Sequence, residues 1–167
     1  MKTRPQISTH KKVIVHKLDQ QSVKGYINPQ ACFEADGIEL LSQAGQVLRL
    51  PWAEVKGVYF VREFDAEVDR PERKTFSSRP KLEGLWVRLK FKDNDVIEGI
   101  IPNNLLEATE KGYMITPPDL YANHQRIFVP RQALVEMSVL GVITPGQRRR
   151  RVLTEEERSR QARLFAE

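Results

Sequence analysis

The sequence holds few of the residues on which covalent and metal chemistry depend. Its 167 residues include a single cysteine, Cys32, and three histidines, His10, His16 and His124. A lone cysteine forms no disulfide within the chain, which is typical of proteins from a reducing compartment. None of the histidines has a second histidine or cysteine at metal-ligand spacing. The sequence therefore predicts no metal site and no cofactor.

Long apolar segments are also missing. No run approaches the roughly 18 apolar residues of a membrane span, and the first residues, MKTRPQISTHKK, lack the apolar stretch of a secretion signal. We therefore expect a cytoplasmic protein that does not associate with membranes. Apolar residues still make up 40% of the chain and charged residues 29%, values near those of ordinary globular domains, so a packed core is expected.

The familiar catalytic motifs are missing as well. The sequence has no glycine-rich phosphate loop, no H-E-x-x-H pair and no G-x-S-x-G elbow. Cys32 has no base paired with it in the sequence, so we interpret it as a small buried residue. Asp93 and Asp95, two apart in a polar stretch, are interpreted as turn formers and not as an acid/base pair. We predict that the protein is not an enzyme.

The sequence does contain a repeated pattern. Aligning Gly25 with Gly99, an offset of 74 residues, also places Val13 on Val87. Farther on, LRLPWAEVKGVYFV (residues 48–61) matches IFVPRQALVEMSVLGV (residues 127–142) at an offset of 79 to 80. Each copy reads as an alternating β-branched strand, an Asp-containing turn, a strand interrupted by glycine, and three further short strands. Glycine inside a strand predicts a bulge, a bend or a close backbone approach.

This pattern predicts an all-β protein of two tandem small five-stranded antiparallel barrels with a short C-terminal helix. The capping-box arrangement of Thr154 and Glu157 supports that helix. Phe76 and Leu82 are the apolar residues expected to anchor the segment between the barrels. The predicted units are a first barrel (12–61), a charged linker (62–83), a second barrel (84–145) and a basic tail with the helix (146–167).

This layout resembles the small barrels of the Sm-like and SH3-like groups. The stretches GLWVRLKFKDNDVIEGIIPNNLL (residues 84–106) and NHQRIFVPRQALVEMSVLGV (residues 123–142) are similar to an uncharacterised bacterial domain family that carries two such units. That likeness covers residues 12–143 and implies no established activity. Sm-like proteins bind RNA partly through an Ile-Arg-Gly-like motif, usually as rings of six or seven barrels. The corresponding stretches here, EVKGVYF and LVEMSVLG, lack the Arg-Gly pair, so that RNA site is not carried over.

The positive charge lies at the two ends of the chain. The formal net charge is +5, and the basic residues cluster in residues 1–12, which include Lys11 and Lys12, and in the tail. The tail holds a run of four arginines: Arg148, Arg149, Arg150 and Arg151. Such clusters attract phosphate, and aromatic residues can stack on bases; the candidates are Tyr26, Phe33, Tyr113 and Tyr121. RNA or DNA binding through the arginine run is therefore one functional hypothesis.

Protein binding is the leading hypothesis. A non-enzymatic adaptor built on rigid barrels would bind an unknown protein through its irregular loops, and a homo-oligomer is a further option. The candidate contacts in these loops are Asn103, Asn104 and Tyr121. Trp52 and Trp86 are large enough to anchor an interface, although core packing is the preferred interpretation of Trp86. A cyclic-dinucleotide or other small-ligand sensor is the third hypothesis.

Overall fold

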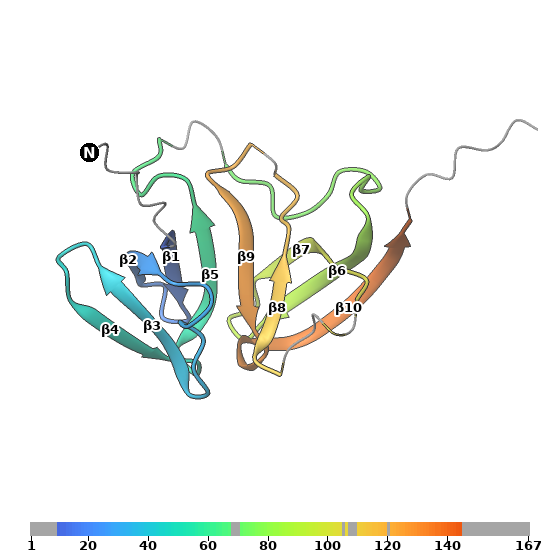
Figure 1. Cartoon of the computed structure of the whole chain (residues 1–167). Coiled ribbons are helices and arrows are strands. Elements are labelled where there is room, and N and C mark those ends of the chain that lie inside the picture. Colours follow the sequence, from blue (N-terminus) through green and yellow to red (C-terminus); the bar gives the residue numbers. More distant parts are fainter. Residues whose placement is uncertain (1–9, 68–70, 105, 107–109, 120, 145–167) are drawn as a thin grey trace, which may run out of the picture.

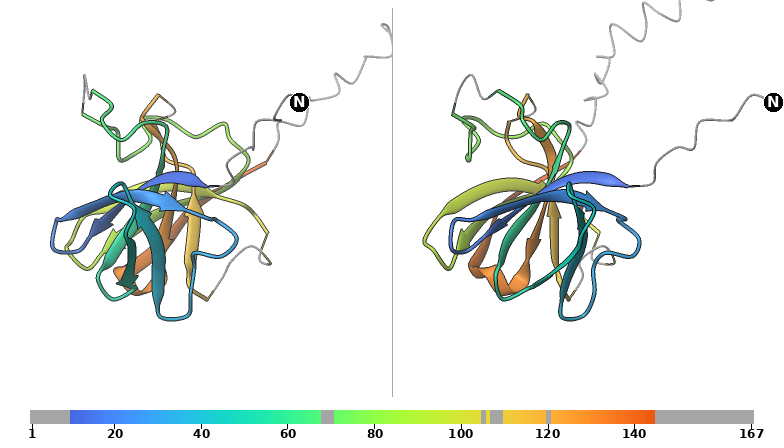
Figure 2. Two further views of the ribbon diagram at one scale, coloured as in Figure 1. Left: turned by 60° about the vertical axis from the view of Figure 1, so that its left-hand side comes forward. Right: turned by 90° about the vertical axis from the view of Figure 1, so that its left-hand side faces the viewer.

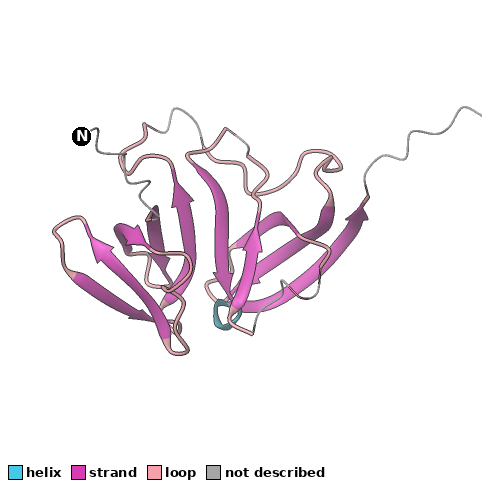
Figure 3. Ribbon diagram, in the orientation of Figure 1, coloured by secondary structure: helices cyan, strands magenta, loops and turns pink. Residues whose placement is uncertain are grey.

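The described residues form an all-β structure. The computed structural model describes residues 10–67, 71–104, 106, 110–119 and 121–144 (Figure 1). Strands dominate, and the described part contains one short 3-10 helix (Figure 3). The elements are β1 (Lys11–Lys17), β2 (Ser22–Ile27), β3 (Gly37–Ser42), β4 (Val47–Pro51), β5 (Val55–Val61), β6 (Gly84–Phe91), β7 (Val96–Ile101), β8 (Gly112–Ile115), β9 (His124–Pro130), η1 (Arg131–Ala133) and β10 (Leu134–Ile143).

The strands assemble into two sheets and not into two closed five-stranded barrels. A seven-stranded sheet has the order β4-β3-β2-β1-β5-β9-β8, and a three-stranded sheet has the order β10-β6-β7. The predicted division into five and five is not observed because β9 pairs with β5 over His124–Phe128, whereas β7 is joined to the residue after β8 by the isolated bridge between Ile100 and Thr116. The sheets are strongly curved (Figure 2), and the three-stranded sheet shares the second core with β8 and β9 of the larger sheet.

The predicted polar turns are confirmed. The side chain of Asp19 accepts a hydrogen bond from the N–H of Gln21 at 3.0 Å, and Asp93 accepts one from Asp95 at 3.1 Å. Between them, Gln20 and Asn94 adopt left-handed backbone conformations with φ of 69° and 66°. An Asp side chain that bonds two residues ahead favours chain reversal, so these turns are fixed locally by the sequence.

The two strand glycines mark close backbone approaches. Gly25 lies opposite Val13 on β1, and Gly99 lies opposite Val87 on β6. A Cβ added at Gly25 would lie 2.6 Å from the carbonyl oxygen of Leu41. One added at Gly99 would lie 3.1 Å from the carbonyl oxygen of Thr116. Of the three readings of a strand glycine, close approach to the next strand is the one observed.

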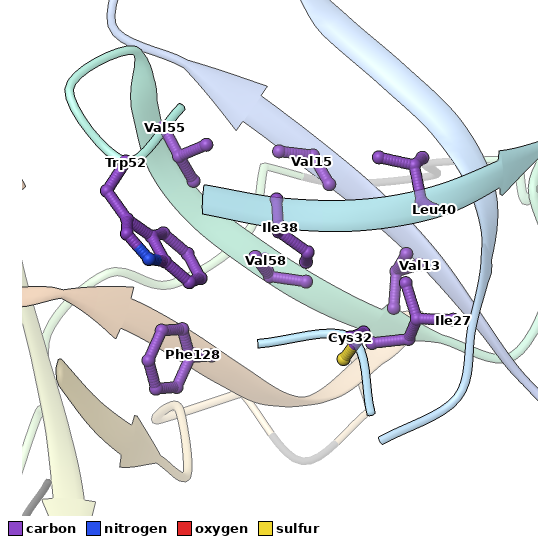
Figure 4. Close-up of a cluster of buried hydrophobic side chains, with 10 residues drawn as sticks. All are labelled: Val13, Val15, Ile27, Cys32, Ile38, Leu40, Trp52, Val55, Val58 and Phe128. Atoms are coloured by element: carbon purple, nitrogen blue, oxygen red, sulfur yellow. The ribbon is translucent and has the colours of Figure 1, made fainter. Parts of the chain in front are cut away.

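Two hydrophobic cores lie on the two faces of the β5–β9 pair. Side chains alternate across a strand, so neighbouring residues of β5 and β9 enter different cores. Phe128 joins the first core beside Trp52 (Figure 4), whereas Ile127 joins the second core and Tyr59 of β5 packs against that core. The β5–β9 pair therefore contributes buried side chains to both cores. Neither core is built from only one half of the chain.

The segment between β5 and β6 is attached to the sheets. Phe76 contacts the ring of Trp86 edge-on at 6.0 Å, as expected for an anchor, while Leu82 is 50% exposed. The carbonyl of Lys74 accepts the N–H of Glu98 at 2.7 Å. The predicted basic tail and its helix lie outside the described residues. No described helix is long and apolar enough to cross a membrane.

Candidate functional site

A cationic pocket opens at one end of the first core. Its volume is about 610 Å³, within the range of ligand sites. Four strands of the seven-stranded sheet and the loop after β2 line it. The lining residues are Lys11 and Lys12 of β1, Pro29 and Phe33 of the loop, Phe60 and Val61 of β5, the adjoining Arg62, Met114 of β8, and Gln125 and Arg126 of β9.

The floor of the pocket is apolar and fixed from behind. Phe33, Phe60 and Met114 are half-buried and pack against the first core. The ring of Phe33 lies 4.5 Å from that of Phe128 and 5.9 Å from that of Trp52, measured between centroids. A ring held on one side by other aromatic rings keeps its remaining face available for a flat ligand group without a large loss of side-chain entropy on binding.

The rim of the pocket is positively charged. Phe60 of β5 lies opposite Arg126 of β9, so the β5–β9 pairing places this exposed arginine beside the apolar floor. Arg62 is held at the rim by Gln125. In the amide orientation that satisfies both side chains, the Gln125 oxygen accepts from Nε and Nη2 of Arg62 at 3.1 and 2.6 Å. The rim also includes Lys11, which is exposed.

One carboxylate, which is not itself a lining residue, forms an ion pair with a cation of the rim. Glu63 accepts a hydrogen bond from the ammonium of Lys12 at 3.0 Å. Glu63 is highly exposed, and an exposed ion pair is worth less than about 1 kcal/mol. The four cationic side chains of the lining, with no carboxylate among the lining residues, give the pocket a net positive field. A ligand with an anionic group and a flat apolar group matches this arrangement.

The structure brings together some of the predicted binding residues. Lys11 and Lys12 of the basic N-terminal region and the aromatic residue Phe33 all line the pocket. Tyr26 lines a smaller pocket of about 260 Å³ together with His10 and Cys32. A third aromatic candidate, Tyr113, lies outside both pockets, and its hydroxyl accepts a hydrogen bond from Arg131 at 3.0 Å.

The predicted loop contacts lie outside this pocket. Asn103 and Asn104 are exposed in the loop after β7, and Tyr121 is 87% exposed in the loop before β9. They are absent from the pocket lining, so their role in partner binding stays a prediction. Arg148, Arg149, Arg150 and Arg151 lie outside the described residues. Sequence reasoning missed Arg62 and Arg126, because each became a pocket residue only through the long-range pairing of β5 with β9.

A comparison with models of protein families shows the family to which the chain belongs. A family model described as "Family of unknown function (DUF6982)" matches residues 9–141. The chain belongs to the DUF6982 family. The expectation of an uncharacterised domain family is therefore confirmed, and membership in DUF6982 brings no assigned activity. Comparisons with curated proteins and with solved structures found no significant match.

A second polar cluster joins the hairpin of β6 and β7 to β5. The ammonium of Lys56 lies 2.6 Å from a carboxylate oxygen of Asp93 and 3.0 Å from one of Asp95. Lys74 binds the same Asp95 at 2.8 Å. Burial alone would raise the pKa values of both aspartates, but the hydrogen bonds from the ammonium groups outweigh it and lower them. Both carboxylates are therefore ionised at neutral pH. This fits a structural role as ion-pair partners of Lys56 and Lys74, and not an acid/base pair that shares a proton.

Two histidines pack against Tyr59 of β5. Tyr59 lies between His16 and His124, with ring centroids 4.5 and 5.0 Å away and both rings edge-on. His124 is buried, and its Nδ1 lies 3.3 Å from a carboxylate oxygen of Glu72. Burial raises the pKa of Tyr59 to about 12, so the phenol stays neutral. Among the described residues, no group of three or more His, Cys, Asp or Glu side chains is placed to hold a metal ion.

The surroundings of His16 predict a pH-dependent stability. Burial lowers the pKa of His16 below 6.5, the charges of His124 and Lys56 lower it further, and Glu72 only partly opposes them. The unfolded chain then binds a proton more readily than the folded chain. We expect the free energy of unfolding to fall as the pH drops below 6.5. Urea unfolding at pH 7, 6 and 5 measures this slope, and His16→Gln should make it shallower. Equal slopes for the variant and the wild type would contradict this assignment.

Proposed function

We propose that the chain is a non-enzymatic binding module that holds single-stranded nucleic acid in the cationic pocket. One observation carries the proposal, namely the combination of four cationic side chains with an apolar aromatic floor in a pocket of about 610 Å³. Phosphate groups would lie against the rim, and a base would cover Phe33 or Phe60. Base stacking on an aromatic side chain is worth about 1–3 kcal/mol per base, and it tolerates any base.

The contacts required by this proposal come from separate parts of the chain. Lys11 is at the start of β1, Phe33 is in the loop before β3, and Arg126 is on β9. The binding surface therefore exists only in the folded chain, unlike a basic tail, which attracts phosphate without any fold. This difference separates the pocket from the arginine run as the source of affinity. The same chemistry would also admit a cyclic dinucleotide, the small-ligand form of this proposal.

The test is binding of a fluorescein-labelled oligouridine of ten nucleotides, followed by anisotropy at several salt concentrations. We expect affinity to fall with salt, because the cations displace counterions from the strand. The double substitution Lys11→Ala/Arg126→Ala should weaken binding by at least about tenfold and reduce the salt slope by about 1.4, since each phosphate contact on a single strand contributes about 0.7. The matched control is Lys90→Ala/Lys92→Ala, which removes the same charge from exposed sites outside the pocket lining.

Two further comparisons sharpen the result. Inorganic polyphosphate offers the charge without a base, so it should compete less well than oligouridine if the aromatic floor takes part. An unlabelled cyclic dinucleotide that competes at lower concentration than oligouridine would assign the pocket to the small ligand. Equal weakening by both double substitutions would place the affinity outside the pocket, and an absence of binding at low salt would end the proposal.

A further inference from the structure

β10 is the counterpart of β5 in the second half of the chain, but unlike β5 it has, among the described strands, a partner on only one edge. β5 pairs with β1 on one side and with β9 on the other. β10 is placed on β6 in the same way, since Val139 lies opposite Val87 as Phe60 lies opposite Val13. The position on β10 that corresponds to β9 is vacant, because no strand pairs with the outer edge of β10 among the described residues.

The strand that corresponds to β9 is β4. Gly37 lies opposite Pro51 on β4, and Gly112 lies opposite Pro130 on β9. A Cβ added at either glycine would lie 2.2 Å from a carbonyl oxygen of the strand beside it. β4 and β9 are therefore packed on their neighbouring strands in the same manner. One edge of β9 is taken by β5, whereas the outer edge of β4 carries no strand within the described part of the chain.

We propose that the protein associates head to tail with further copies of itself, with β10 of one copy pairing antiparallel with β4 of the next. The two edges lie at opposite ends of the molecule (Figure 1), so they cannot meet within one copy. The register follows from the junction inside the chain. Phe60 lies opposite Arg126 there, and the corresponding positions place Val139 opposite Val47 of the next copy.

The side chains at these positions fit such a contact. Val47 of β4 is 66% exposed and Val139 of β10 is 55% exposed. Leu41, the cross-strand partner of Val47, is 39% exposed. Valine pairs directly opposite each other stabilise antiparallel sheets, and their burial removes apolar surface from water. The proposed register would thus bring the exposed Val47 and Val139 against each other.

Another sheet edge is covered inside the chain. β7 ends the three-stranded sheet, but its Glu98 N–H donates to Lys74, and its Ile100 exchanges two hydrogen bonds with Thr116 of the segment after β8. Exposed edge strands are usually blocked in this way, because their unpaired backbone groups recruit other chains. β10 is the longest strand of the structure, and its outer edge has one described blocking contact, from the Arg79 guanidinium to the carbonyl of Val142.

The geometry makes the interface heterologous, because each copy offers two different edges. Repetition of such a contact gives a closed ring or an open filament. Sedimentation velocity of the full chain from about 1 to about 200 µM should show species larger than a monomer, increasing with concentration. Val47→Lys and Val139→Lys should each reduce the sample to monomers at most concentrations. Leu106→Lys is the control, because Leu106 is 94% exposed and lies outside every strand.

A mixing experiment separates this assembly from a symmetric dimer. The Val47→Lys copy keeps an intact β10, and the Val139→Lys copy keeps an intact β4. An equimolar mixture should therefore form one-to-one dimers and stop there, although each variant alone is monomeric. In a symmetric β10–β10 dimer, Val47→Lys would have no effect. That outcome, or a wild-type chain that stays monomeric at about 200 µM, would overturn the proposal.

Cross-linking tests the register directly. Oxidation of the double variant Val47→Cys/Val139→Cys should give a ladder of disulfide-linked oligomers, whereas the Leu106→Cys/Val139→Cys variant should not. Cys32 does not interfere, because it is buried and its pKa is raised to about 11 by that burial, so little thiolate forms. A ladder of equal intensity from both variants would show random collision and would contradict the register.

Discussion

Replacing Phe128 with alanine should lower the free energy of unfolding by about 3–5 kcal/mol, the range for buried phenylalanines. Phe128 is 5% exposed, and its ring lies 4.5 Å from Phe33 and 5.6 Å from Trp52 between centroids. The residue belongs to β9, yet it fills the first core. The loss combines the transfer of the ring to water with the cavity left between two other aromatic rings. A domain stability of about 5–15 kcal/mol makes this a large fraction.

Urea unfolding followed by tryptophan fluorescence and far-ultraviolet circular dichroism measures the effect. Both signals should shift together, because the β5–β9 pair contributes side chains to both cores. Tyr121→Ala is the control, since a side chain 87% exposed should change the stability by less than about 0.5 kcal/mol. A loss below about 1 kcal/mol for Phe128→Ala would contradict its place in the first core.

Glu98→Ala should lower the free energy of unfolding by about 2–4 kcal/mol, because it leaves partly buried donors without an acceptor. Glu98 lies on β7 opposite Arg88 and is 3% exposed. Its carboxylate accepts hydrogen bonds from the Phe76 N–H at 3.0 Å, from Trp86 Nε1 at 3.1 Å and from the Arg88 guanidinium at 2.9 Å. The same carboxylate therefore holds the β6–β7 hairpin and the segment that precedes β6.

The pH dependence gives this prediction a second readout. Burial alone would raise the pKa of Glu98, but the hydrogen bonds from Phe76, Arg88 and Trp86 outweigh it and lower the pKa below its ordinary 4.5. A lowered carboxylate pKa stabilises the fold fully above pH 4.5, and this contribution is lost as the pH falls through the folded value. The difference between wild type and Glu98→Ala should therefore narrow in acid. Glu39→Ala, which breaks an exposed pair with Arg49, should cost less than about 1 kcal/mol at every pH.

The candidate site shows where reasoning from sequence stopped. Lys11, Lys12 and Phe33 were recognised as binding residues by their type, and the pocket contains all three. Arg126 lies in a stretch whose pattern predicts only a strand, and Arg62 lies in a segment interpreted as a linker. Charge and aromatic character are properties of single residues, whereas the prediction of a pocket depends on which strands are neighbours in the sheet. That knowledge was missing, because β5 and β9 are separated by 62 residues from Val61 to His124.

The sequence by itself determined the local architecture of this protein. The alternating β-branched segments, the Asp turns and the strand-ending Pro51 and Pro130 fixed where the strands begin and end, since each depends on backbone preferences within a few residues. Tertiary structure decided how the strands were divided between sheets. The pairing of β5 with β9 closes a long loop of the chain, which costs conformational entropy. That cost is offset by the burial of side chains such as Phe128 in a core formed mainly by other strands.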